Sequence, residues 1–198
     1  MFTHTKELLT TAPAIEPVSV DEVRLHCRVP DTFHDDDAYL ATLIVAARTL
    51  LEQQCWSSFV TQVWDFWWSS FDSRLFIPRG PLILITKFQY RSTESPYALT
   101  EIAAATYETS TENQFPFVRL AYNQTWPTSR GHADDIYMRA SLGYGATAAS
   151  VPMPIRHAIK LLVGDWYSNR EETPGGVPRR VESRVDALIG PYRIKEGL

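Results

Sequence analysis

Apolar residues recur at helical spacing in the first quarter of the chain, and the polar residues beside them mark where helices begin. Ser19 and Glu22 have the three-residue spacing of a capping box, and Val18 and Val23 occupy the positions of a hydrophobic staple. These signals predict a short helix that begins at Ser19 and ends near Arg28.

A second, longer helix is expected from about residue 36 to residue 54, with Asp35 or Asp36 as its cap. Arg48 and Glu52 are four residues apart and are expected to form an exposed pair on its surface. The apolar face of this helix comprises Tyr39, Leu40, Leu43, Ile44, Ala47, Leu50 and Leu51.

Between residues 59 and 142 the pattern becomes that of β-strands, with many aromatic residues. Strand alternation over residues 59–68 places Trp67 on the side opposite to Val60, Trp64, Phe66 and Trp68. Alternation over residues 135–142 is equally regular and points four side chains inward, those of Ile136, Met138, Ala140 and Leu142.

Further strands are expected at 74–77, at 82–90, around Tyr107 and at 115–120. Residues 82–90 start with apolar side chains on both faces, which is typical of a central strand. Pro116 lacks a backbone N–H, so it favours an edge position for the 115–120 strand.

A Pro-started helix follows the turn formed by Gly143, Tyr144 and Gly145. Pro152 and Pro154 suit a first helical turn, where a missing N–H is not required. The helix has an apolar stripe that must be buried; it consists of Ile155, Ala158, Ile159, Leu162, Val163 and Trp166. The side opposite this stripe carries Arg156, Lys160, Gly164 and Ser168.

A charged, Pro- and Gly-rich linker is expected at 169–180, and a last short helix at 181–189 with Val181, Val185 and Leu188 as its stripe. The first eleven residues are Thr-rich and are expected to be a frayed end. The whole pattern predicts an α+β fold. We expect one domain, 1–198, in which helices (15–56 and 152–189) form a core around a β-rich insertion (59–142), followed by a tail (190–198).

Composition limits the classes of function. The chain has 198 residues, 44% of them hydrophobic, with a formal net charge of −4, which disfavours non-specific nucleic-acid binding. It has no apolar run of the length of a membrane span, and we expect no signal peptide in its Thr-rich start. Cys27 and Cys55 are expected to be free thiols, because neither has the spacing of a metal or redox motif.

Three short patterns suggest chemistry, and each has a simpler structural interpretation. His34 precedes three aspartates, but consecutive residues at a helix start do not converge on one ion and suit a cap better. His26 and Cys27 are adjacent, so on a helix their side chains diverge. Gly143 and Gly145 lack the spacing of a phosphate-binding loop. We therefore expect no catalytic residue, metal or cofactor, and a protein that is not an enzyme.

Four tryptophans, Trp56, Trp64, Trp67 and Trp68, fall within thirteen residues. Aromatic side chains on a sheet can bind sugars or single-stranded bases, but they also supply cores and protein interfaces. Core and subunit interface is the preferred interpretation. A carbohydrate-binding virion or surface module that uses this sheet remains an alternative, and a small hydrolase with a dispersed site is a second one.

The order of the motifs resembles that of tailed-phage head–tail connector (neck adaptor) proteins. The resemblance covers about residues 15–192, and Tyr167 begins the motif that resembles the family's usual end to its long helix. It rests on residues 16–29, 35–40, 43–48, 61–64, 76–82, 143–145 and 154–171.

The resemblance implies a virion structural protein in the neck, at the head–tail interface, assembled in the host cytoplasm. It implies a homo-oligomeric ring, commonly a dodecamer, between the portal protein and a stopper or tail-completion protein, with DNA passing through the lumen without specific binding and no membrane contact. It also suggests that the C-terminal region faces the portal. The expected interface residues there are Arg179, Arg180, Tyr192, Arg193 and Ile194, unless the tail folds back on its own domain.

Overall fold

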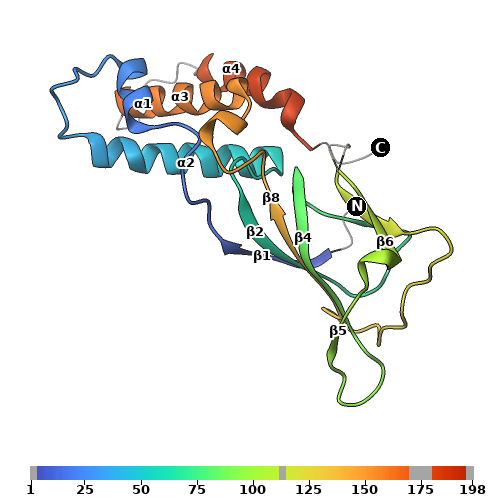
Figure 1. Cartoon of the computed structure of the whole chain (residues 1–198). Helices are drawn as coiled ribbons and strands as arrows, with labels where there is room; N and C mark the ends of the chain where they lie inside the picture. Colours follow the sequence, from blue (N-terminus) through green and yellow to red (C-terminus); the bar gives the residue numbers. More distant parts are fainter. Residues whose placement is uncertain (1–3, 112–114, 170–179, 195–198) are drawn as a thin grey trace. The chain divides into compact units, whose positions relative to one another are not determined.

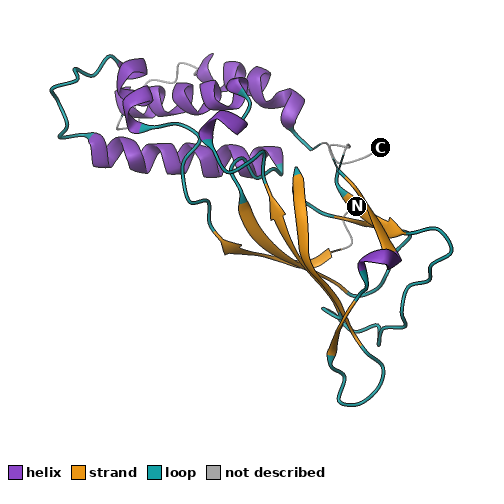
Figure 2. Cartoon of the chain, in the orientation of Figure 1, coloured by secondary structure: helices purple, strands orange, loops and turns teal. Residues whose placement is uncertain are grey.

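The computed structural model describes residues 4–111, 115–169 and 180–194. It confirms an α+β protein with two helices before and two helices after a β-rich segment (Figures 1 and 2). Backbone contacts group the chain into two compact units. We call Ala14–Val60 with Tyr144–Arg193 the helical unit, and the remaining residues the β unit.

The helical unit is organised around one central helix. Its helices are α1 (Val20–Cys27), α2 (Asp37–Cys55), α3 (Met153–Ser168) and α4 (Arg180–Ile189). The Pro-started helix α3 packs against each of the other three. The buried side chains of α3 are Ile155, Ala158, Ile159, Leu162 and Val163, as the stripe predicts.

The polar side of α3 does not face only solvent. Arg156 donates hydrogen bonds to the Pro17 carbonyl and to Glu22, at 2.9 and 2.6 Å. A Cβ atom added at Gly164 would lie 3.2 Å from the His26 ring. Since α1 packs on this side of α3, the polar residues here serve as contacts between helices.

The start of α1 follows the sequence prediction closely. Ser19 caps the helix, accepting a hydrogen bond from the Glu22 amide while the Glu22 carboxylate accepts one from the Ser19 amide. Val18 and Val23 are both buried in the core of the helical unit. The helix ends at Cys27, and Arg28 adopts the left-handed conformation that terminates it.

One expectation for α2 was confirmed in position only, and another was wrong. Asp36 is the N-cap residue, but its side chain makes no capping hydrogen bond. The Asp36 carboxylate instead accepts a hydrogen bond from the Tyr167 hydroxyl, at 2.6 Å. Arg48 and Glu52 do pair, but both are buried, with 8% and 7% of their surface exposed. Periodicity did not reveal this, because the contacts that complete the pair, Glu16 for Arg48 and the Phe59 N–H for Glu52, lie outside the helix.

The β unit contains two antiparallel sheets. The larger has the order β1 (His4–Thr11), β2 (Gln62–Trp68), β8 (Ile136–Leu142), β4 (Leu82–Arg91) and β5 (Leu99–Glu101). The smaller has the order β3 (Arg74–Phe76), β7 (Phe117–Leu120) and β6 (Tyr107–Ser110). Side chains of both sheets share one core, which includes Phe66, Trp68, Phe88, Val118 and Met138.

Three sequence predictions for the β unit and its borders were wrong, and one was confirmed in part. The Thr-rich start is no frayed end, because β1 pairs with β2 over its length. Val60 precedes β2 and lies in the core of the helical unit. Pro116 does not make its strand an edge: β7 starts one residue later and lies between β3 and β6. β4 does lie between two strands, β8 and β5, as predicted for a central strand. Among the described residues, however, β5 pairs only with the last three residues of β4.

None of the helices that the structure describes is long and apolar enough to cross a membrane.

Candidate functional site

The patterns that suggested chemistry do not form a reactive site. Within residues 4–111, 115–169 and 180–194, no group of three or more potential ligands is placed to hold a metal ion. His34 pairs with Asp37 at 2.9 Å, as part of a structural network. Cys27 is a free thiol whose pKa is raised by burial, which lowers its nucleophilicity at neutral pH.

The glycine turn uses its amides within the chain. Gly143 donates its N–H to the Pro81 carbonyl at 2.9 Å, and Tyr144 donates to the Phe59 carbonyl at 3.1 Å. These two N–H groups are therefore engaged by backbone carbonyls. The surfaces that the chain presents are the remaining candidates for function.

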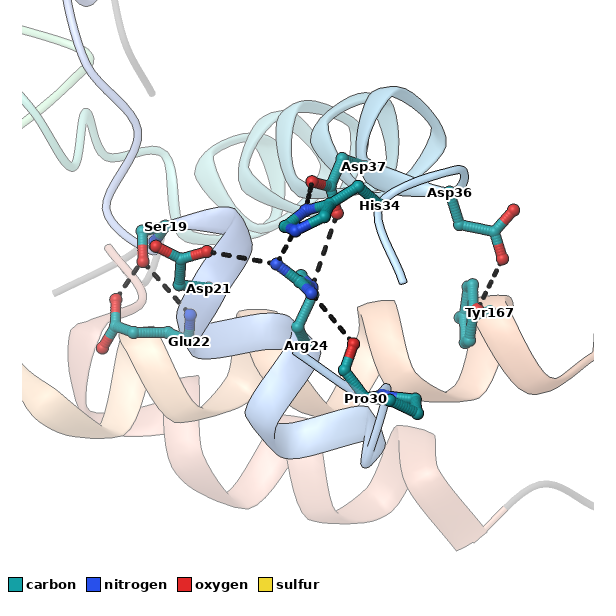
Figure 3. A network of polar contacts seen from close by, with 9 residues as sticks. All are labelled: Ser19, Asp21, Glu22, Arg24, Pro30, His34, Asp36, Asp37 and Tyr167. Carbon is teal, nitrogen blue, oxygen red and sulfur yellow. Dashed lines mark hydrogen bonds and ion pairs between the residues drawn. The ribbon is translucent and has the colours of Figure 1, made fainter. Parts of the chain in front are cut away.

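A buried arginine fixes the loop between α1 and α2. Arg24 lies at the centre of the network in Figure 3 and is only 5% exposed. Its guanidinium donates to the Pro30 carbonyl at 2.9 Å and lies 3.1 Å from the His34 ring nitrogen. It also lies within ion-pair distance of Asp21 and Asp37. The arginine therefore connects α1, the loop and the start of α2.

The tip of this loop is presented to solvent. Asp31, Phe33 and Asp35 are exposed, and Phe33 keeps 39% of its surface accessible. We call residues 31–35 the acidic loop. An exposed aromatic ring between two carboxylates, on a loop fixed from behind, is a preformed contact surface.

Two further arginines, Arg48 and Arg156, hold the chain segment that enters α1. Arg48 donates to Glu16 and to Glu52, both at 2.7 Å. The other carboxylate oxygen of Glu52 accepts the Phe59 N–H at 2.7 Å. Arg156 bonds the Pro17 carbonyl. These contacts connect the entering chain, α2 and α3 through charge-assisted hydrogen bonds, which are the stronger kind.

The described part of the expected C-terminal interface lies against its own chain. The ring of Tyr192 packs edge to face on Tyr144, with centroids 6.5 Å apart. Arg193 forms an ion pair with Asp186 at 2.5 Å, and its side chain stays one-third exposed. Ile194 is buried. Arg180 begins α4, and Arg179 lies outside the described residues.

A groove of about 350 Å³ lies among α2, α3 and α4. Trp166 lines it and is half-buried, so the stripe of α3 ends at a surface and not in the core. Its other lining residues are Leu50, Gln54, Leu162, Asp165, Val181, Glu182, Val185 and Asp186.

The tryptophan cluster divides between the two faces of the larger sheet. Trp68 is buried in the core, and Trp64 packs against it from the same face. Trp67 points to the other face, which we call the outer sheet face, where its ring packs against Tyr137 at 5.4 Å. Lys6 lies over the Trp67 ring, with its Nζ 4.6 Å from the centroid. The three rings therefore do not form one aromatic platform.

An ion pair crosses the outer sheet face beside Trp67. Arg139 donates two hydrogen bonds to the Asp65 carboxylate, at 2.7 and 2.8 Å. Burial would raise the pKa of Asp65, but hydrogen bonds from Arg139, Tyr137 and Thr10 outweigh it and hold the pKa below its ordinary value. Asp65 therefore stays ionised, and the guanidinium of Arg139 compensates its charge.

Sequence reasoning missed the burial of Arg24 and the partial burial of Arg156. Arg24 and Arg156 looked like surface residues, because each lies in a helix among other polar side chains. The available signal was the density of acids near Arg24, with Asp21 on the same helix face and Asp37 beyond the loop. That signal does not specify which acid pairs with which base.

Comparison with known proteins places this chain among virus-related structural proteins. Residues 17–124 match the model of the phage gp6-like head-tail connector protein family. No curated protein sequence gives a significant match.

Similar solved structures extend the likeness to nearly the whole chain. A chain from the neck of an empty gene transfer agent (GTA) particle, computed with C6 symmetry, is 19% identical with a TM-score of 0.81, over 98% of each chain. A chain from the virion of a native GTA particle is 20% identical with a TM-score of 0.76, over 98% of each.

A third structure, the neck of the native GTA particle computed with C12 symmetry, is 19% identical with a TM-score of 0.73, over 96% of this chain and 97% of that one. At these identities the solved structures establish a shared fold. Because the family model covers more than half of the sequence, this chain belongs to the phage gp6-like head-tail connector family.

Proposed function

We propose that this chain is a virion structural protein of the neck, which forms a connector ring between the capsid portal and the tail or stopper. The observation that carries the proposal is family membership over residues 17–124, joined to a shared fold over nearly the whole chain with a protein of GTA necks. The chain acts by assembly, and DNA passes through the ring without specific binding.

The charge of the chain is consistent with such a channel. A formal net charge of −4 per copy gives a ring a net negative field, which opposes adsorption of the DNA backbone. The contacts of Arg48 and Arg156 stabilise the helical unit, because each one connects segments that are distant in sequence. Ring closure needs such rigidity, since small errors of angle accumulate around a ring.

The ring is proposed to contain twelve copies, in keeping with the C12 symmetry used for one similar neck. Its portal contact is proposed to involve the C-terminal segment, with Arg179, Arg180, Tyr192, Arg193 and Ile194. Arg193 is the sharpest member to test, because its side chain is partly exposed although it pairs with Asp186. Assembly is proposed to take place in the host cytoplasm.

The carbohydrate-binding alternative has less support. Binding platforms place several rings on one accessible face, whereas Trp64 and Trp68 pack into the core beneath the sheet. Trp67 and Tyr137 remain on the outer sheet face.

The proposal is tested in particles of the virus or gene transfer agent that encodes the chain. Deletion of its gene is expected to leave DNA-filled heads that do not join tails, and antibody labelling is expected to mark the neck. Normal tailed particles without the protein would contradict the proposal. Turnover of a broad esterase or glycosidase panel, lost in a single-residue variant, would contradict a purely structural function.

The portal contact has its own pair of variants. Arg193→Glu is expected to weaken portal attachment at least about tenfold, because it reverses an exposed interface charge. Asp186→Ala is the matched control: it removes the same intramolecular ion pair but keeps the arginine. If both variants bind the portal as the natural chain does, Arg193 is no part of the contact.

A further inference from the structure

The outer sheet face combines apolar, aromatic and cationic side chains that are open to solvent. Leu8 on β1 and Leu84 on β4 keep 51% and 58% of their surface exposed. Between these strands, Trp67 and Tyr137 pack side by side. Aromatic residues, with arginine, are the residue types most enriched at the centre of protein interfaces.

The charge of this face differs in sign from that of the chain as a whole. Its cations are Lys6 over the Trp67 ring, exposed Lys87, Arg91, which donates to the Tyr97 carbonyl, and Arg139, which neutralises Asp65. In the register of the sheet, Lys87 lies across from Arg139. Glu101, at the β5 end, pairs with Gln89 and is the acid at the far border of the face. Lys6 and Lys87 are the two exposed cations among them, whereas Arg91 and Arg139 are half-buried.

The acidic loop has the complementary composition. Asp31 and Asp35 flank exposed Phe33, and Arg24 fixes the loop from behind through the Pro30 carbonyl. A rigid loop loses little conformational entropy on binding. Its two carboxylates match the two available lysines, and its aromatic ring matches the surface that Trp67 and Tyr137 form.

We propose that the outer sheet face of one copy receives the acidic loop of the next copy around the ring. The inference rests on the proposed ring function. A ring with one kind of head-to-tail contact needs two different, complementary surfaces on the same chain. The opposite charges of the acidic loop and the outer sheet face, and the exposed aromatic side chains on both, meet that requirement.

The experiment uses two charge-reversed forms of the full chain. One carries Lys6→Glu and Lys87→Glu on the sheet, and the other carries Asp31→Lys and Asp35→Lys on the loop. All four side chains are exposed, so both forms are expected to fold. Each form alone brings like charges together and is expected to assemble at least about tenfold less well than the natural chain.

Mixing the two forms in equal amounts gives the decisive measurement. Reversed sheets then meet reversed loops, and natural sheets meet natural loops, so the forms can alternate around an even-numbered ring. Recovery of rings in the mixture, by native mass and negative-stain microscopy, is the expected result. The control Arg74→Glu with Arg119→Glu changes the net charge equally on the smaller sheet and is expected to assemble normally.

The outcomes separate the two proposals. A natural chain that forms no ring, alone or in its particles, contradicts the proposed function. If the natural chain forms rings, three results contradict this inference and leave the proposed function intact. They are normal assembly of the reversed forms, no recovery on mixing, and a control that fails as strongly as the reversed forms.

Discussion

Arg48 and Glu52 form a buried ion pair at 2.7 Å, one turn apart on α2. Glu52 also accepts the Phe59 N–H, and Arg48 also donates to Glu16. The pair therefore connects the chain that enters the helical unit to the chain that leaves it for β2. Because both partners are buried, removing one of them is expected to cost more stability than it would in the exposed pair that helical spacing predicts.

Replacement of Glu52 by Ala is expected to destabilise the protein by about 3–5 kcal/mol, because it leaves a buried guanidinium under-compensated. Chemical denaturation measures the change. The matched control is Glu108→Ala, which breaks an exposed pair with Arg119 and should cost less than about 1 kcal/mol. Equal costs for the two variants would show that burial does not strengthen the Arg48 pair.

Replacement of Arg24 by Met should loosen the acidic loop while keeping the apolar stem of the side chain. The lost hydrogen bond to the Pro30 carbonyl and the lost charge contacts are expected to cost about 1–3 kcal/mol. Amide hydrogen exchange across residues 28–36 should become faster. Arg28→Met, at the exposed end of α1, is the control and should leave these rates unchanged.

Trp166→Ala tests how much the groove-facing end of α3 contributes. Because Trp166 is half-buried, its loss should cost about 2 kcal/mol, less than a fully buried aromatic would. Ile159→Ala, at a fully buried position of the same helix, should cost about 3 kcal/mol or more. A reversed order in the free energies of unfolding would place Trp166 in the core.

Gly145→Ala should be costly for two separable reasons. Gly145 has φ +152°, and an added Cβ would lie 2.6 Å from the Ser150 Oγ. The expected loss is about 1–3 kcal/mol. Gly131→Ala is the control, because its φ is +77° but nothing lies within 4 Å of the added carbon. Adding Ser150→Gly should relieve the clash and restore part of the stability, and no recovery would argue against a steric cause.

Acid should destabilise the β unit through Asp135, which is fully buried. Burial would raise its pKa, but hydrogen bonds from Arg130 and the His132 amide outweigh it and lower the pKa below its ordinary value of 3.8. As the pH falls, the Asp135 carboxylate therefore takes up a proton at a higher pH in the unfolded chain than in the folded one. The stabilisation is present above about pH 4 and is lost as pH falls through the folded-state pKa. Denaturation between pH 7 and pH 2 should show a shallower slope in Asp135→Asn, and an unchanged slope would contradict this assignment.

Local sequence signals predicted the elements well where each signal acts over one turn or one strand. The capping box of Ser19 and Glu22 formed as expected. The alternation of β8 buried all four expected side chains. By contrast, Pro116 was misleading, because a proline just before a strand takes nothing from the ladder of that strand.

Candidate surfaces were less predictable than elements. The Trp-rich segment carried the correct alternation, and Trp67 does face away from Trp64 and Trp68. No local pattern indicates that Lys6, from the far N-terminal strand, covers the Trp67 ring. That contact depends on strand order, which is set by long-range packing.

The sequence by itself determined the α+β order, the helix starts and the two faces of the central strands, because propensity, capping and periodicity act between near neighbours. Only the tertiary structure decided how deeply the polar residues are buried, fully for Arg24 and Arg48 and in part for Arg156. Arg24, Arg48 and Arg156 each find acids or carbonyls brought close by folding. A charge is tolerated inside a protein only where such partners converge, and their convergence is a property of the folded chain.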